Sequence, residues 1–252
     1  MLTGSSNVYL GDYSGGFAIG HANVFIGKYA GKGSSTASNN TGVCNIAIGR
    51  CSLKSFTSGG NNIAIGNESM SAAAVTGSSN VAIGQQAAKQ LNTGTHNIAL
   101  GKDAGCGMTS GGYNVVFGNL SAKCLTTGTY NVLLGERAGC LLAGGNYNVF
   151  MGRYAGRQVA GGSYNTILGD ESGMGQTSGN CNVIIGHGSR AASTTGSCQL
   201  SIGLEANNWV TGDSNFNVGI GTNVFTTAVG AGVTAKAYVG ILSAYQLYGD
   251  GS

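Results

Sequence analysis

The sequence predicts an all-β fold, a parallel β-solenoid built from coils of about 17 residues. Three observations lead to this fold class. A unit that follows the pattern Asn-(Val/Ile)-x-(Ile/Leu)-Gly, with a substitution in a few copies, occurs thirteen times. Its spacing is 17 residues at every step from Asn80 to Gln199, and the 252 residues include 47 glycines and no proline. A repeat of this length indicates one supersecondary unit that stacks on its neighbours, because a single unit cannot bury its own apolar face.

Each coil is described by its distance from the first residue of the unit, which is position zero. The units begin at Asn7, Asn23, Asn45, Asn62, Asn80, Asn97, Asn114, Asn131, Asn148, Asn165, Asn182, Gln199 and Asn217. Position +4 is Gly in all thirteen units and position −3 is Gly in twelve. Because Gly adopts a positive φ without steric cost, we expect these positions to be the two corners of each coil.

The residues from −1 to +3 alternate and are often β-branched, which indicates a short strand. We expect positions +1 and +3 to fill the interior, because 25 of these 26 residues are apolar. Strand alternation then places +2 on the opposite face, where most residues are apolar too, so this face should be buried against other chains. The interface stripe predicted at +2 includes Phe25, Val116, Leu133, Phe150, Ile167 and Ile184.

Other positions complete the predicted coil. Position +7 is Ala or Ser in twelve units, which suits a tight interior, and apolar residues at +11 from Phe56 to Val159 predict a second, weaker strand. The Asn side chains at position zero should bond along the rod as a ladder. Stacked about 4.8 Å apart, thirteen rungs would give a rod roughly 60 Å long.

The pattern divides the chain into two regions. Residues 1–221 are the predicted solenoid, with a polar loop inserted at 32–42, and residues 222–252 lose the Asn unit and are expected to form a short C-terminal β adaptor. Charged residues lie mainly at +5 and +6, which marks the solvent side. Glu136, Arg153 and Asp170 alternate in sign at +5 of successive coils, and such exposed pairs contribute ~0–1 kcal/mol each.

The units Asn62-Ile-Ala-Ile-Gly66 and Asn80-Val-Ala-Ile-Gly84 resemble the head repeats of trimeric autotransporter adhesins. The longer spacing and the ending from Asn217 to Ser252 look more like bacteriophage tail-fibre proteins. These resemblances imply an intertwined or side-by-side homotrimer in a virion or a cell-surface appendage. They also imply a structural shaft with other fibre or virion proteins as partners, or alternatively an adhesin that binds a host glycan or receptor on this segment.

Stacked aromatic residues are the main candidate ligand site. Tyr113, Tyr130, Tyr147 and Tyr164 occupy position −1 in four successive coils, with His96 before them. Such rings could bind the apolar faces of sugars, or they could form an aromatic ladder that only stabilises a coil corner. We favour the ladder, because −1 shares the strand phase assigned to the interior.

Composition and motifs argue against other classes. The chain lacks the strict Gly-X-Y triplet of collagen. Its formal charge of +3 is not gathered into a basic block, so nucleic-acid binding is not predicted. No apolar run is long enough for membrane insertion. We expect no signal peptide. Threonines are too sparse for an ice-binding array.

We also expect no enzyme activity, cofactor or metal site. Asp170 and Glu171 are the only adjacent carboxylate pair, and neighbouring strand residues point to opposite faces, so they do not form a glycosidase pair. Motifs for a catalytic nucleophile or a metal site are missing. The seven cysteines lack Cys-x-x-Cys spacing and are expected to be free and packed.

Overall fold

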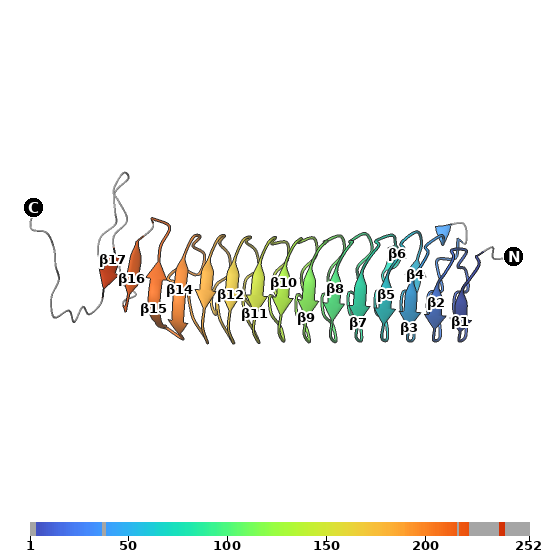
Figure 1. Cartoon of the computed structure of the whole chain (residues 1–252), viewed down its shortest axis with the longest axis horizontal. Coiled ribbons are helices and arrows are strands. Elements are labelled where there is room, and N and C mark those ends of the chain that lie inside the picture. The colour runs from blue at the N-terminus through green and yellow to red at the C-terminus, as the bar shows by residue number, and fades with distance from the viewer. Residues whose placement is uncertain (1–3, 37–38, 216, 222–236, 240–252) are drawn as a thin grey trace, which may run out of the picture.

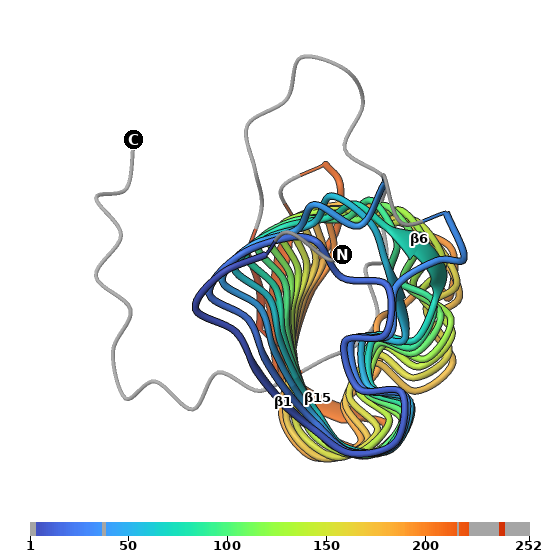
Figure 2. The ribbon, with the colours of Figure 1, turned by 90° about the vertical axis from the view of Figure 1, so that its right-hand side faces the viewer.

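The computed structural model describes residues 4–36, 39–215, 217–221 and 237–239. Its coils stack along one axis into a rod (Figure 1), and a view along that axis superimposes them as one closed outline (Figure 2). Every element that the described residues form is a strand, and coils of about 17 residues make about 11 turns. The predicted all-β parallel solenoid is confirmed, with fewer turns than the thirteen rungs expected.

One strand from each coil joins a continuous sheet. The parallel strands are β1 (Val8–Leu10), β2 (Val24–Ile26), β3 (Ile46–Ile48), β5 (Ile63–Ile65), β7 (Val81–Ile83), β8 (Ile98–Leu100), β9 (Val115–Phe117), β10 (Val132–Leu134), β11 (Val149–Met151), β12 (Thr166–Leu168), β13 (Val183–Ile185) and β14 (Leu200–Leu204). Equal positions of successive units lie opposite each other, as Val132 lies opposite Val149. The register therefore reproduces the sequence repeat residue by residue.

A second sheet is short. β4 (Ser55–Phe56) pairs in parallel with β6 (Ala73–Val75). The predicted second strand around +11 is thus present at β4, whereas Leu91, Leu125 and Leu142 occupy the same position outside any strand. All of these +11 side chains are nonetheless fully buried, so their predicted interior location is confirmed.

The last predicted rung differs from a coil. β15 (Asn207–Gly212) pairs antiparallel with β14, and β16 (Val218–Ile220) pairs antiparallel with β15. The unit at Asn217 is therefore reached through a hairpin, since the extended run from Asn207 continues as a strand where earlier coils turn. β17 (Ala237–Val239) pairs in parallel with β16, and the rest of the predicted adaptor 222–252 lies outside the described residues.

The prediction of which strand face points inward was wrong. All six side chains assigned to a trimer-interface stripe lie fully buried inside the single coil stack: Phe25, Val116, Leu133, Phe150, Ile167 and Ile184. Positions +1 and +3, which were expected inside, are partly or largely exposed in every parallel strand. The reason is that the residue at position zero points inward, and strand alternation then sends +2 inward and +1 and +3 outward.

The inward Asn side chains form the predicted ladder. The Asn131 amide nitrogen Nδ2 donates to Oδ1 of Asn114 at 3.0 Å and to the Gly145 carbonyl at 2.8 Å. Its own Oδ1 accepts hydrogen bonds from the backbone N–H and the Nδ2 of Asn148, both at 3.0 Å. Each amide thus joins successive coils and also ties the start of its own coil to the end of that coil.

The two repeated glycines serve different purposes. Gly135, at +4, has φ of 134°, and a Cβ there would overlap the carbonyl of Gly152 in the next coil. Gly145, at −3, has no positive φ, and Gly is needed because a Cβ would overlap the Gly162 carbonyl. The prediction of a positive-φ corner is therefore confirmed at Gly135 and wrong at Gly145, where close approach of the coils is the constraint. At −3 of the two following coils, Gly162 and Gly179 do have a positive φ, of 113° and 104°.

Replacing one rung of the ladder should destabilise the rod. Asn131→Ala leaves the buried Gly145 carbonyl and the backbone N–H of Asn148 without their side-chain partners, so we expect a loss of about 2–4 kcal/mol in the free energy of unfolding. Denaturant unfolding followed by circular dichroism measures this change. Asn119→Ala is the control, because Asn119 is exposed and should change stability by less than about 0.5 kcal/mol. Equal effects of the two variants would contradict a stabilising role for the ladder.

A matched glycine pair tests the coil spacing. Gly135→Ala should lower stability by about 2 kcal/mol or more, because it combines a left-handed backbone with overlap against backbone atoms. Gly161→Ala should be tolerated, since nothing lies within 4 Å of the added methyl group. Thermal melts of both variants give the comparison, and a Gly135→Ala protein that melts at the wild-type temperature would show that the coils can separate freely.

Candidate functional site

Five rings form a continuous stack on the surface. The ring centroids of His96, Tyr113, Tyr130, Tyr147 and Tyr164 are 4.7–5.0 Å apart, and neighbouring planes differ by 3–5°. Each of these residues has a left-handed backbone, with φ between 56° and 61°. This conformation turns the −1 side chain out of the coil immediately before the Asn ladder begins.

The stack is an aromatic ladder, but it is not internal. The four tyrosines are 46–59% exposed, which contradicts the interior phase assigned to position −1. Their ring faces cover one another, so a sugar would meet ring edges and hydroxyl groups along most of the stack. The outer face of Tyr164, the most exposed ring, is the place where a pyranose could stack, and glycan contact there stays a prediction.

The outer side of the long sheet carries a second surface, which we call the outer apolar face. It consists of the side chains at +1 and +3 in the twelve parallel strands of the long sheet, from β1 to β14 without β4 and β6, and Thr166 is its one polar member. Its most exposed residues are Val8, Leu10, Ile83, Ile98, Phe117 and Met151. The face follows the sheet without interruption, because every coil adds two apolar side chains at the same register.

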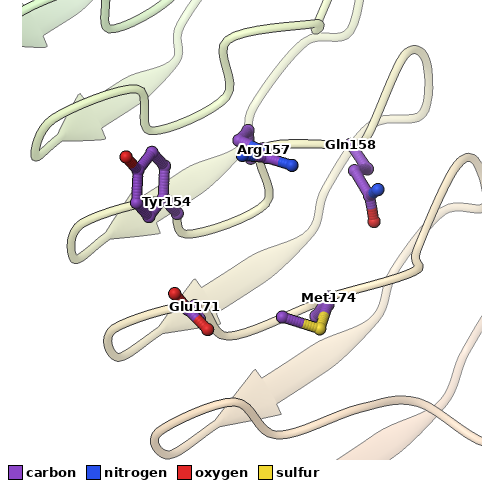
Figure 3. A pocket seen from close by; sticks show the side chains of 5 residues that line it. All are labelled: Tyr154, Arg157, Gln158, Glu171 and Met174. Carbon is purple, nitrogen blue, oxygen red and sulfur yellow. The ribbon is translucent and has the colours of Figure 1, made fainter.

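A third surface combines two adjoining pockets on another wall of the coil, and we call it the basic groove. One pocket, of about 350 Å³, is lined by Tyr154, Arg157, Gln158, Glu171 and Met174 (Figure 3). The other, of about 290 Å³, is lined by Leu120, Lys123, Arg137, Cys140, Leu141, Arg157 and Gln158. They share Arg157 and Gln158. This groove was not predicted from the sequence, although the cations at +6 and +9 of neighbouring coils indicate it.

Three guanidinium groups surround one ring in this groove. The guanidinium carbons of Arg153, Arg157 and Arg137 lie 4.9, 5.2 and 5.8 Å from the centroid of Tyr154. Arg153 is neutralised, since its Nε lies 3.0 Å from Asp170 and its Nη2 lies 3.7 Å from Glu171. Hydrogen bonding from Arg153 lowers the pKa of the Asp170 carboxyl, which fits the predicted alternation of charge along +5.

The remaining cations of the groove have no such partner. Within the described part of the chain, Lys123, Arg137 and Arg157 form no ion pair. All three lie close enough to the Cys140 thiol to act on it electrostatically. Burial and the neighbouring Cys124 nevertheless raise the pKa of Cys140, so the groove holds a neutral thiol among unpaired positive charges.

The cysteines are unpaired, but they are not all packed. Cys44, Cys181 and Cys198 are exposed, Cys51 is buried, and the other three are half-buried. The prediction of packed thiols is therefore wrong for the three at position −1, which share the outward-turned conformation of the tyrosines.

No other chemical centre is evident in the part of the chain that the structure describes. Asp170 is engaged by Arg153, and no three His, Cys, Asp or Glu side chains among the described residues gather as metal ligands. Those residues also include no helix long and apolar enough to cross a bilayer.

Comparison of the chain with protein-family models, with curated proteins and with solved structures finds no match in any of the three. The class of protein is therefore defined by its fold, a parallel β-solenoid with repeated surfaces, and its function has to be argued from those surfaces.

The aromatic stack should contribute to stability. Tyr130→Ala removes stacking with both Tyr113 and Tyr147, and at about 0.5–1.5 kcal/mol for each aromatic pair we expect the melting temperature to fall. Tyr130→Phe keeps both ring contacts and should melt like the wild type. Differential scanning calorimetry distinguishes the two variants. An unchanged melting temperature for Tyr130→Ala would mean that the aromatic stack does not stabilise the fold.

Proposed function

We propose that this chain is a non-catalytic structural fibre segment, a rigid spacer arm in a host-attachment appendage such as a phage tail fibre. The observation that carries the proposal is the outer apolar face, which runs along the whole parallel sheet of an elongated rod. Parallel sheets are normally covered on both faces, and a long exposed apolar patch marks an interaction surface.

The proposed occupant of this face is another copy of the same chain. A partner has to offer apolar side chains at the pitch of the coils along the full rod, and an identical rod does so. Closed cyclic symmetry is the usual arrangement for such self-association. The resemblance of the repeats to trimeric adhesin heads and tail fibres favours three copies. This interface replaces the incorrectly assigned +2 stripe, and the side chains now involved are those at +1 and +3.

Rigidity follows from the coil stack. Each coil is held to the next by strand pairing, by further backbone hydrogen bonds in the turns and by the Asn ladder, so bending the rod would break several bonds in one coil. A spacer of this kind suits a virion or a cell surface, with other fibre or virion proteins bound at its ends. The alternative function, an adhesin that binds ligand on this segment, is favoured by one observation, the unpaired cations of the basic groove.

Self-association can be tested by analytical ultracentrifugation. We expect the wild-type protein to sediment as a trimer and the double variant Phe117→Lys/Met151→Lys as a monomer, because two charges would be buried in the outer apolar face of each chain.

Leu141→Lys is the matched control. Leu141 is an exposed apolar residue, 47% accessible, in the basic groove and not in the outer apolar face, so this variant should remain trimeric. A monomeric wild type at micromolar concentration would overturn the trimer, and a trimeric double variant would place the interface elsewhere.

A further inference from the structure

We propose that the basic groove binds an acidic sugar, whose carboxylate pairs with Lys123, Arg137 and Arg157. This inference goes beyond the spacer function and does not depend on trimerisation. It rests on the charge of the groove, on the way the coils hold its side chains and on the division of hydrogen-bonding groups between its two pockets.

The charge of the pocket lined by Lys123 favours an anion. Three cations converge there without an ion-pair partner among the described residues, and no carboxylate lines that pocket. Gathering like charges raises their free energy, and a bound carboxylate would offset the repulsion through charge-assisted hydrogen bonds. Arg side chains suit this role because their planar donors match a carboxylate in two places.

The coil stack holds the cations in place. Lys123, Arg137 and Arg157 come from three successive coils, so their separation follows the pitch of the rod. The backbone around them is hydrogen-bonded from coil to coil: the Cys124 N–H donates to the Cys140 carbonyl at 3.0 Å, and the Leu141 N–H donates to the Arg157 carbonyl at 3.2 Å. A site built on such a scaffold is organised before ligand arrives, which reduces the entropy lost on binding.

Gln158 adds a donor between the pockets. Its Oε1 accepts a hydrogen bond from the backbone N–H of Gly175 at 2.7 Å, so its Nε2 is the group left to donate. The polar side chains of the Lys123 pocket are therefore all donors: Lys123, Arg137, Arg157 and Gln158. Such a set fits an acceptor-only group, and a carboxylate is one.

The adjoining pocket explains why the ligand should be a sugar. Glu171 and Tyr154 line it, from neighbouring coils that lie one below the other in Figure 3. Glu171 can accept hydrogen bonds from hydroxyl groups, but its charge would repel a second anion, which disfavours nucleic acid and other chains with closely spaced charges. Leu120 and Leu141 provide apolar contacts for ring C–H groups. Pockets of about 350 and 290 Å³ also suit a small molecule better than a protein surface.

Binding is tested with the full chain and carboxylated oligosaccharides. Digalacturonate and sialyllactose would be titrated at low salt by isothermal calorimetry, each beside its uncharged methyl ester. We expect at least one acid to bind about tenfold or more tightly than its ester, since a charged hydrogen bond is lost on esterification. No binding at millimolar concentration, or equal binding of acid and ester, would overturn the proposal. Inorganic phosphate that binds as tightly as the best sugar would also overturn it, because the site would then recognise only charge.

Variants identify the groove as the site. Arg137→Gln and Arg157→Gln should each weaken binding about tenfold or more while the melting temperature stays unchanged. Arg50→Gln is the control. Arg50 is an exposed arginine that pairs with Glu68 of the next coil, and this pair lies several coils away from the basic groove. The Arg50→Gln protein should therefore bind the sugar like the wild type. Wild-type affinity in Arg157→Gln would place the ligand elsewhere. Sedimentation of the same variants keeps the two proposals separate, since loss of sugar binding should leave self-association intact.

Discussion

The inward Asn amide is the interaction on which the rest of this structure depends. Because Asn131 and its equivalents point into the coil, period-two alternation fixes the direction of every other strand side chain. Phe150 and Ile167 become core residues, and Val149 and Met151 remain outside. The same amide bonds to the carbonyl of a glycine at −3 and so closes the coil. Buried amides of this kind are stable only when all their hydrogen bonds are made, and the exact repeat along the rod allows each amide to supply the partners of the next.

Much of the fold could be predicted from the sequence, since the coil length, the parallel register, the ladder and the buried residues at +7 and +11 all follow from periodicity. The strand phase could not be predicted, because positions +1, +2 and +3 are all apolar and pattern alone does not distinguish their faces. An Asn would ordinarily be placed outside, and only the cooperative ladder reverses that preference. The hairpin at β15 was missed because the unit at Asn217 preserves the repeat while Asn207–Gly212 breaks the coil. The basic groove assembles side chains from residues 120–174, whose convergence depends on how the turns project.

The surfaces of the rod are separated by position within the coil. The outer apolar face is formed by side chains at coil positions +1 and +3, and the aromatic stack by side chains at −1. In the basic groove, Arg137 lies at +6 and Arg157 at +9. Each surface is therefore held by the same backbone and can be used without moving the others. Association of chains through the sheet would leave the groove accessible, so a spacer could also carry ligand sites along its length. If both proposals hold, one solenoid would serve as a spacer and also bind ligand.

The left-handed residues at −1 have one further consequence. Their side chains leave the coil, so packing does not dictate their identity, and the position holds Ser6, Ala22, Cys44, Asn61, His96 and the tyrosines alike. Side chains in such a column can be replaced one by one, while the backbone keeps their spacing fixed. New binding specificities could thus arise by single substitutions at −1, with the side chains of neighbouring coils always about one strand spacing apart.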